Sequence, residues 1–186
     1  MAIYHLILLP SYPVENAVNY YKNWLARHIG PFTARYSVPH VSLAMFQMNF
    51  YKELSLLRTL ESAAAEEGPF SLYTNGFGFF DSTRTVYIQV EEKEQFARLS
   101  DNLHEKSTIA LLPNAYKSIV HVPHLTIGRN LAHKFEPACS LFQHSIVSQT
   151  FTASAVTLLK KNKQEKSEVL QVFPFLSRSS PQLTLF

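Results

Sequence analysis

One short segment occurs twice in the chain and constrains its fold more than any other feature. Residues 38–44 read VPHVSLA and residues 122–128 read VPHLTIG, so three positions are identical and the other four change only between similar side chains. Each copy is a run of β-forming residues with a proline near its start. Proline removes one backbone donor and biases the preceding residue toward extended geometry, which suits the start of a strand.

Side-chain alternation along a strand groups the polar residues of each copy. Because residues i and i+2 point to the same face, His40 lies beside Ser42 and His124 beside Thr126. The apolar residues of the other face are available to the core: Val41, Leu43, Leu125 and Ile127. Each copy therefore presents one imidazole and one hydroxyl.

Two imidazole–hydroxyl pairs related by a repeat suggest a groove with an approximate two-fold axis and a histidine on each side. In-line displacement at phosphorus needs a nucleophile and a leaving group on opposite apices. Histidine suits both ends because its ordinary pKa of about 6.5 makes base and acid forms accessible near neutrality. The hydroxyls would donate to the non-bridging oxygens. In the alternative interpretation, the histidines are satisfied strand residues and the repeat reflects similar packing.

The composition is that of a globular protein with few charges. The 186 residues are 46% hydrophobic and 17% charged, which suits one domain over residues 1–186. A net charge of +3 permits a polyanionic partner, but a duplex-DNA binder would show a denser basic stripe, so we expect no duplex DNA. We expect a monomer.

The single cysteine, Cys139, excludes an intramolecular disulfide and indicates a reducing compartment, so we expect a cytoplasmic protein. Residues 1–10 form a short apolar run without a basic region and read as a first strand, not a signal peptide. No apolar stretch approaches the roughly 20 residues of a membrane-spanning helix, and we expect no membrane partner.

The hydrophobic pattern alternates between strands and helices and then turns to hairpins, which indicates two lobes of one α+β domain. The predicted strands are 3–9, one within 32–46, 70–80, 84–90, one at 122–128, 150–159 and 169–175, with the last two as a hairpin. The predicted helices are 14–29, 51–67, one from 91 to before Pro113, and 134–146. The second helix should bury Leu54, Leu57, Leu60 and Ala64. Residues 177–186 are a tail that is loose or docks its last four residues as an edge strand.

Three features have two interpretations each. The rings of Phe77, Phe79 and Phe80 belong to the core or provide a stacking platform for a base. The connection 160–166 carries four lysines and is a solvated hairpin tip or a finger that attracts phosphate. Glycines 76 and 78 indicate a bulge or a close approach to the backbone.

Metal and cofactor chemistry finds little support. His121 and His124 are three residues apart, on opposite faces of a strand, and make a poor ligand pair. Only two aspartates occur, and no carboxylate-rich cluster is visible. Phosphate-loop, dinucleotide-binding and serine-hydrolase motifs are missing, so we expect neither a metal nor a cofactor. The remaining histidines have no matched partner and are interpreted as structural or surface residues: His5, His28, His104, His133 and His144.

Arg129 follows the second copy of the repeat. Strict alternation would place it on the face opposite to His124, but Gly128 allows the chain to turn and return the guanidinium to the groove. Arg129 is therefore a candidate phosphate-binding residue, and a surface ion pair is the alternative.

The paired H-x-S/T triplets resemble the signature of the 2H phosphoesterase superfamily. The wider layout is similar to its 2′-5′ RNA ligase and RNA 2′,3′-cyclic phosphodiesterase branch. The likeness covers roughly residues 2–175 and includes the first strand that ends in proline, the glycine–phenylalanine run at 76–80, the HLTIGR segment at 124–129 and the closing hairpin.

The resemblance implies a bilobal, two-fold pseudo-symmetric α+β fold with antiparallel sheets around a central groove. It implies metal-independent hydrolysis of a 2′,3′-cyclic phosphate, on a nucleotide or RNA terminus, to a 2′-phosphate, with reversible 2′-5′ RNA ligation as a related reaction. It assigns catalysis to His40 and His124 and phosphate binding to Ser42 and Thr126. By analogy His124 is the base and His40 the acid, and the two-fold makes the reverse order sensible.

The chain departs from the family pattern by having serine in the first triplet and no arginine three residues after it. Serine donates the same hydrogen bond, so the departure bears on long-RNA specificity and not on the chemistry. Two alternatives stay open. One is a phosphodiesterase for another small cyclic or 2′-5′ nucleotide, and the other is a non-catalytic module that binds an RNA end or a nucleotide.

Overall fold

The computed structural model describes residues 1–161 and 167–178. The strands are β1 (Ala2–Leu8), β2 (Val41–Met48), β3 (Phe70–Phe80), β4 (Thr85–Val90), β5 (Lys117–Ile119), β6 (His124–Gly128), β7 (Thr150–Ala153), β8 (Ala155–Lys161) and β9 (Glu168–Pro174). The α-helices are α1 (Tyr12–Ile29), α2 (Glu53–Glu66), α3 (Lys93–Glu105) and α4 (Phe135–Phe142). Short 3-10 turns are η1 (Thr33–Tyr36), η2 (Phe50–Lys52), η3 (Thr108–Leu111), η4 (Asn114–Tyr116) and η5 (Ala132–Lys134).

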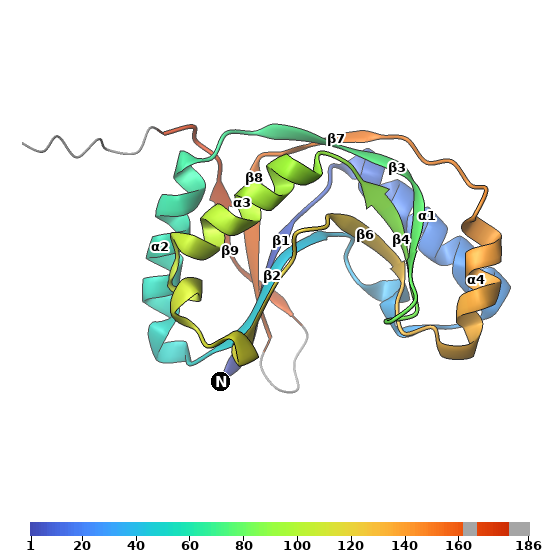
Figure 1. Cartoon of the computed structure of the whole chain (residues 1–186), viewed down its shortest axis with the longest axis horizontal. Coiled ribbons are helices and arrows are strands. Elements are labelled where there is room, and N and C mark those ends of the chain that lie inside the picture. Colours follow the sequence, from blue (N-terminus) through green and yellow to red (C-terminus); the bar gives the residue numbers. More distant parts are fainter. Residues whose placement is uncertain (162–166, 179–186) are drawn as a thin grey trace, which may run out of the picture.

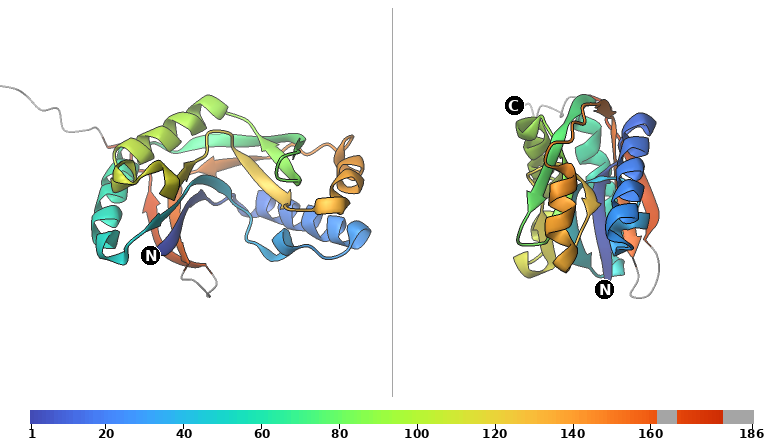
Figure 2. Two further views of the ribbon diagram at one scale, coloured as in Figure 1. Left: turned by 60° about the horizontal axis from the view of Figure 1, so that its bottom comes forward. Right: turned by 90° about the vertical axis from the view of Figure 1, so that its right-hand side faces the viewer.

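The strands of the described part form one nine-stranded antiparallel sheet in the order β7-β3-β4-β6-β2-β1-β8-β9, with β5 paired to β2. The sheet curls, with α2 and α3 at one end and α1 and α4 at the other (Figures 1 and 2). This arrangement confirms the expected bilobal α+β fold. Among the described residues, no helix has both the length and the apolar character that a membrane span requires.

The strand order has two-fold symmetry about the central pair, β6 and β2. Going outward, β4 corresponds to β1, β3 to β8 and β7 to β9. Val41 and Leu125 occupy equivalent positions of the seven-residue repeat, and these two residues pair with each other across β2 and β6. The pseudo-two-fold axis therefore passes between them, and His40 and His124 each lie one residue before it in the chain.

Both halves carry the same irregularity of register. In each half the motif strand has one extra residue relative to the neighbouring strand, β1 or β4, which is a β-bulge. The pairs on either side of the shift are Leu6 with Ala44 and Ile7 with Ser42 in the first half, and Val86 with Gly128 and Tyr87 with Thr126 in the second. The internal repeat thus extends beyond seven residues to the strands that flank them.

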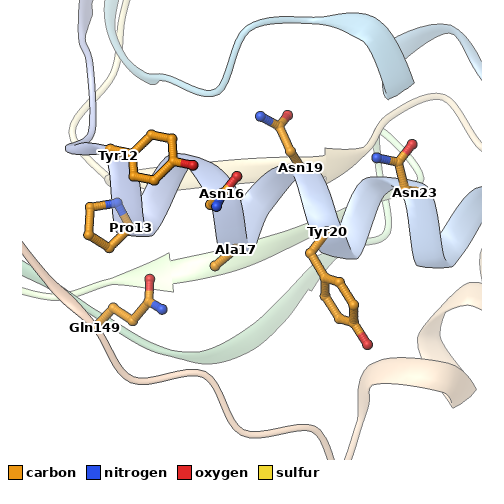
Figure 3. A pocket seen from close by; sticks show the side chains of 8 residues that line it. All are labelled: Tyr12, Pro13, Asn16, Ala17, Asn19, Tyr20, Asn23 and Gln149. Carbon is orange, nitrogen blue, oxygen red and sulfur yellow. The ribbon is translucent and has the colours of Figure 1, made fainter.

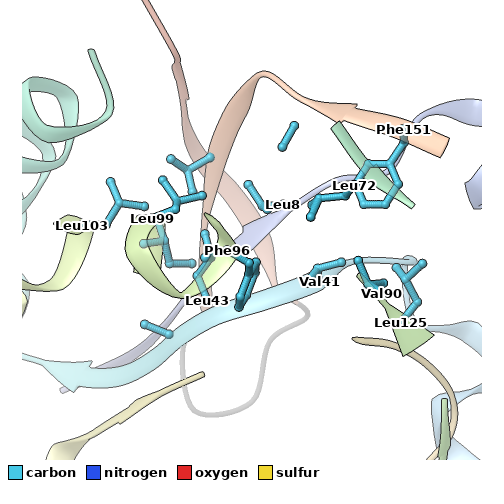
Figure 4. Packing of buried hydrophobic residues seen from close by; sticks show 14 of the residues in the cluster. Leu8, Val41, Leu43, Leu72, Val90, Phe96, Leu99, Leu103, Leu125 and Phe151 are labelled. Carbon is cyan, nitrogen blue, oxygen red and sulfur yellow. The ribbon is translucent and has the colours of Figure 1, made fainter. Parts of the chain in front are cut away.

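The apolar face of each motif strand is buried, as predicted. Val41, Leu43, Leu125 and Ile127 are fully shielded from solvent. They belong to one cluster with the predicted stripe of α3, which is Phe96, Leu99 and Leu103 (Figure 4). Because α1 packs on β6 and α3 on β2, the convex side of the central strands is covered and their polar side faces the groove.

The hairpin of β3 and β4 is antiparallel, as predicted. Its register shifts between Thr74 and Phe77, and Gly76 there has a φ of 69°, a left-handed conformation that favours glycine. The bulge interpretation of Gly76 is confirmed.

The predicted strand at 150–159 is wrong as a single element. The chain breaks at Ser154, so that β7 pairs with β3 at one edge of the sheet while β8 pairs with β1 and β9 near the other. Buried residues recur on both sides of the break, and a local hydrophobic pattern does not show a change of partner strand. Only β8 and β9 form the predicted hairpin.

The predicted core stripe of α2 is partly wrong. Leu54 is 61% exposed, and the residues that are buried include Leu56, Leu60, Ala63 and Ala64. Both stripes fit a helical period. In the structure the buried stripe also includes Ala65, and the 3-10 turn η2 begins the segment in place of α-helix.

Two other expectations fall partly or wholly outside the described residues. Of the lysine-rich connection, Lys160 belongs to β8 and its ammonium lies 2.6 Å from the Glu53 carboxylate, while 162–166 are outside the described residues. The docking of the last four residues of the tail also falls outside them.

Candidate active site

The structure brings all five predicted site residues to one cavity of about 610 Å³: His40, Ser42, His124, Thr126 and Arg129. The cavity lies over the adjoining strands β2 and β6, which occupy the middle of the sheet in Figure 1. Other polar and aromatic groups line it, among them His5, Ser37, Phe80, Thr83 and Thr85.

Each motif histidine is fixed by the same backbone contact. Nδ1 of His40 lies 2.7 Å from the carbonyl oxygen of Val38, and Nδ1 of His124 lies 3.0 Å from that of Val122. A carbonyl oxygen only accepts hydrogen bonds, so Nδ1 carries the hydrogen in both rings. Nε2 is therefore the nitrogen left to exchange a proton with a ligand, on both sides of the pseudo-two-fold axis.

The environment favours the neutral form of both rings. Burial lowers the pKa of His40, and the positive charges of Lys22 and His124 lower it further, against the contact with Val38. Burial and the charge of Arg129 lower the pKa of His124. Both imidazoles are thus mainly neutral at pH 7, and an anion in the cavity would raise both pKa values.

His5 is a site residue that the sequence did not identify. Its Nε2 lies 2.9 Å from Oγ of Ser42, and its ring meets the His40 ring edge to face with centroids 5.0 Å apart. Burial, followed by the charges of His40 and Arg129, lowers the pKa of His5 to about 4. A neutral His5 with hydrogen on Nε2 donates to Ser42, which leaves the serine hydrogen free for a ligand.

The pseudo-two-fold explains why His5 was missed. The matched bulges make Ile7 equivalent to Tyr87, and hence His5 equivalent to Thr85. Thr85 also lines the cavity and its Oγ1 lies 2.9 Å from Oγ1 of Thr83. A histidine in one half and a threonine in the other have no visible likeness in the sequence. The only signal was that His5 alternates with buried residues of the first strand.

The three phenylalanines of β3 divide between the two interpretations. Phe77 belongs to the core and Phe79 packs against it, whereas Phe80 lines the cavity. The ring of Phe80 stacks on Tyr87 with centroids 4.2 Å apart and meets the edge of His124 at 5.2 Å.

Tyr87 in turn lies over Gly78. A Cβ atom added at this glycine would be 2.4 Å from the tyrosine ring, which is closer than any real contact. The close-approach interpretation of Gly78 is confirmed, and the glycine allows the two aromatic rings to lie beside His124.

Arg129 reaches the cavity through a turn after β6. The strand ends at Gly128, and Asn130 has a left-handed φ of 56°. The guanidinium is exposed at the cavity, and no carboxylate of the described residues pairs with it. The surface ion pair considered from the sequence is therefore not formed within the part of the chain that the structure describes.

A buried lysine contacts the segment that precedes His40 in the chain. Lys22 of α1 is only 1% exposed, and its ammonium donates to the carbonyl oxygen of Ser37 at 2.7 Å and to Oγ of Ser37 at 2.9 Å. Burial lowers its pKa to about 8. The sequence contained a signal, because Lys22 lies four residues after Val18 and three before Leu25 and so shares their buried face.

Metal ligands do not gather in the described residues: no three His, Cys, Asp or Glu side chains there lie close enough to hold an ion. His121, which the sequence suggested as a poor partner for His124, pairs instead with Asp101 at 3.2 Å.

A curled antiparallel sheet with two histidine–hydroxyl pairs about a pseudo-two-fold axis defines a phosphoesterase of the two-histidine class. The family model of the 2′-5′ RNA ligase superfamily matches residues 10–165, and the chain belongs to this family.

Individual relatives agree with this assignment. A proposed phosphoesterase of Geobacillus sp. (strain WCH70) is 30% identical over 130 residues, which is 69% of either chain. Among solved structures, TT0787 of Thermus thermophilus aligns with a TM-score of 0.71 and 17% identity, over 96% of this chain and 100% of that one. E. coli LigT complexed with 3′-AMP aligns with a TM-score of 0.63 and 14% identity, over 94% and 97%. The likeness to these two structures establishes the fold.

Proposed function

We propose that the protein is a metal-independent phosphodiesterase that hydrolyses a 2′,3′-cyclic phosphate, on a nucleotide or RNA end, to a 2′-phosphate. The observation that carries the proposal is that the same backbone contact orients both His40 and His124. Both have Nδ1 bonded to a backbone carbonyl, both leave Nε2 free, and both line one cavity with a hydroxyl two residues away.

The reaction needs one base and one acid on opposite sides of phosphorus. Nε2 of His124 takes a proton from water as the water oxygen attacks phosphorus. The bond from phosphorus to the 3′ oxygen breaks, and that oxygen takes a proton from Nε2 of His40. The products are a 2′-phosphate and a 3′-hydroxyl. A 5′-hydroxyl that replaces water gives a 2′-5′ linkage by the same steps, and the reverse reaction exchanges the roles of the histidines.

The polar groups around the histidines suit the charge of this reaction. The hydroxyls of Ser42 and Thr126 donate to the non-bridging oxygens, and Arg129 adds a positive charge. The phosphate anion also raises the pKa of His40, which is low in the free protein. Bound substrate therefore favours the protonated form of His40, which is the form that an acid requires.

The size of the cavity, an aromatic ring beside it and the ligands of a similar protein support a nucleotide as the substrate. A cavity of about 610 Å³ is large enough for one nucleotide, and Phe80 offers an aromatic ring beside His124. E. coli LigT has been solved with 3′-AMP and with ATP.

The test is hydrolysis of 2′,3′-cyclic nucleotides and of an oligonucleotide with a cyclic-phosphate end, in excess EDTA. We expect His40→Ala and His124→Ala each to lose about 10²–10⁴ in rate, while exposed His144→Ala retains full activity. Turnover that disappears with EDTA would contradict a metal-independent reaction. Absence of turnover in folded wild-type protein would contradict catalysis, and tight binding that survives loss of one imidazole would indicate a binding module.

A further inference from the structure

A second cavity adjoins the histidine cavity and shares two residues with it, Met45 and Ser118. Its volume is about 200 Å³. The strands β1, β2 and β5 and the turn η4 form it, where Met45 pairs with Ser118 and Ile3 pairs with Gln47. The two cavities therefore form one continuous groove along β2.

The bulge in β2 makes this continuity possible. Ser42 and Met45 are three residues apart and would point to opposite faces of a regular strand. The register shift opposite Leu6 and Ile7 changes the phase between them. Both side chains consequently line the histidine cavity, and Met45 continues into the second one.

The second cavity has an apolar lining at an otherwise polar site. Ile3, Met45 and Tyr116 line it and remain 37%, 42% and 44% exposed. The cationic residue of the lining, Lys117, directs its ammonium to Nε2 of His104 at 3.0 Å and to the carbonyl oxygen of Ala110 at 3.1 Å. This charge is thereby engaged by neighbouring residues, and the lining suits a flat, uncharged ring.

We propose that this second cavity binds the base of the nucleotide that precedes the one carrying the cyclic phosphate. The inference rests on the proposed function and extends it, because it makes an oligonucleotide end the preferred substrate over a mononucleotide. The terminal nucleotide occupies the histidine cavity, its phosphate lies between His40 and His124, and the preceding base lies on Met45 and Tyr116. Gln47, an exposed amide at the same cavity, can bond the edge of that base.

The size of the effect follows from the contact. Stacking of a base on an aromatic side chain is worth about 5- to 150-fold in affinity. We expect wild-type protein to show a lower KM for a dinucleotide with a cyclic-phosphate end than for the matching mononucleotide. Tyr116→Ala should raise the dinucleotide KM by about 5- to 150-fold and leave the mononucleotide KM unchanged. Tyr116→Phe keeps the ring and should behave like wild type.

A matched control is available on α1. Tyr20 is another exposed tyrosine, at a surface cavity that shares no residue with the groove (Figure 3). Tyr20→Ala should change neither KM. A dinucleotide that lacks the first base supplies a second control, since it should bind wild-type protein and Tyr116→Ala equally.

Each outcome bears on one proposal. Equal KM values for the two substrates, unchanged in Tyr116→Ala, would overturn the base site and leave the phosphodiesterase proposal intact. If neither substrate turns over, the phosphodiesterase proposal fails, and equilibrium binding of a dinucleotide and a mononucleotide with 2′-phosphate ends decides the base site by the same comparison. Tighter dinucleotide binding that Tyr116→Ala abolishes would support it, and equal binding would overturn it.

Discussion

The ammonium of Lys22 lies 2.7 Å from the carbonyl oxygen of Ser37, three residues before His40. The next carbonyl in the chain, that of Val38, accepts the hydrogen bond from Nδ1 of His40. A buried charge from α1 thus holds the turn that orients the first histidine. The described partners of Lys22 include no carboxylate, so its charge also acts on His40 without local compensation.

We expect Lys22→Met to raise the pKa of His40 toward its ordinary value, because a positive charge close to the ring is removed. The variant leaves the Ser37 carbonyl without its donor, which should cost about 1–3 kcal/mol of unfolding free energy. NMR titration of the histidine rings measures the pKa. Lys134→Met is the control, since Lys134 donates to the carbonyl oxygen of Pro31 in the same segment from a less buried position. Equal shifts in both variants would contradict a specific effect of Lys22.

The stability of the protein should fall between pH 6.5 and 4, and most of this window lies above the ordinary pKa values of carboxyl groups. His5, His40 and His124 all have pKa values below the ordinary one. A group with a lowered pKa binds fewer protons in the folded state, so unfolding becomes more favourable as pH decreases through this window. His5, with a pKa of about 4, should contribute a loss of about 2 kcal/mol between pH 7 and 4.5.

Urea denaturation of wild type and His5→Asn at the two pH values measures this contribution. The variant should lose about 2 kcal/mol less than wild type, while His144→Asn, at an exposed site, should follow wild type. Identical pH dependence in all three proteins would show that His5 has no lowered pKa.

Gly78 should be required for the position of the aromatic rings beside His124. In Gly78→Ala the new Cβ would lie 2.4 Å from the Tyr87 ring, so the ring must move, and Phe80 stacks on it. We expect a loss of about 1–3 kcal/mol in unfolding free energy and a lower kcat/KM. The control is Gly68→Ala, whose Cβ meets only the Ser177 hydroxyl, at 3.1 Å. Unchanged activity in folded Gly78→Ala would contradict a role for these rings.

The repeat predicted the residues of the cavity that are chemically alike in the two halves. His40 and Ser42 match His124 and Thr126 in type and spacing, so a pattern of seven residues was sufficient to place them. His5 escaped because its equivalent is Thr85, and pairing across strands relates the two only through matched bulges. Symmetry of the backbone survives such substitutions, whereas symmetry of the sequence does not.

The fold shows the same limit. Local periodicity located most strands and helices of the two halves. It did not show that the segment 150–159 breaks at Ser154, where the chain passes from a strand at one edge of the sheet to a strand near the other edge. It also allowed two phases for the core stripe of α2. In both cases the choice depends on which distant element the segment packs against, and that information is not local.

The hydroxyl of Thr126 should act on phosphate and not on folding. Thr126→Val keeps the shape of the side chain and removes its donor, and the hydroxyl makes no hydrogen bond to another described side chain. We expect kcat/KM for a cyclic phosphate to fall by about 10²–10³ and inhibition by inorganic phosphate to weaken. The unfolding free energy, measured in urea, should change by less than about 1 kcal/mol. Ser42→Ala should lower kcat/KM alike, because both hydroxyls lie at the same cavity. It should also cost about 1–3 kcal/mol of unfolding free energy, because Oγ of Ser42 is the hydrogen-bond partner of Nε2 of His5. A Thr126→Val protein that unfolds readily but keeps its activity per folded molecule would show that this hydroxyl is structural.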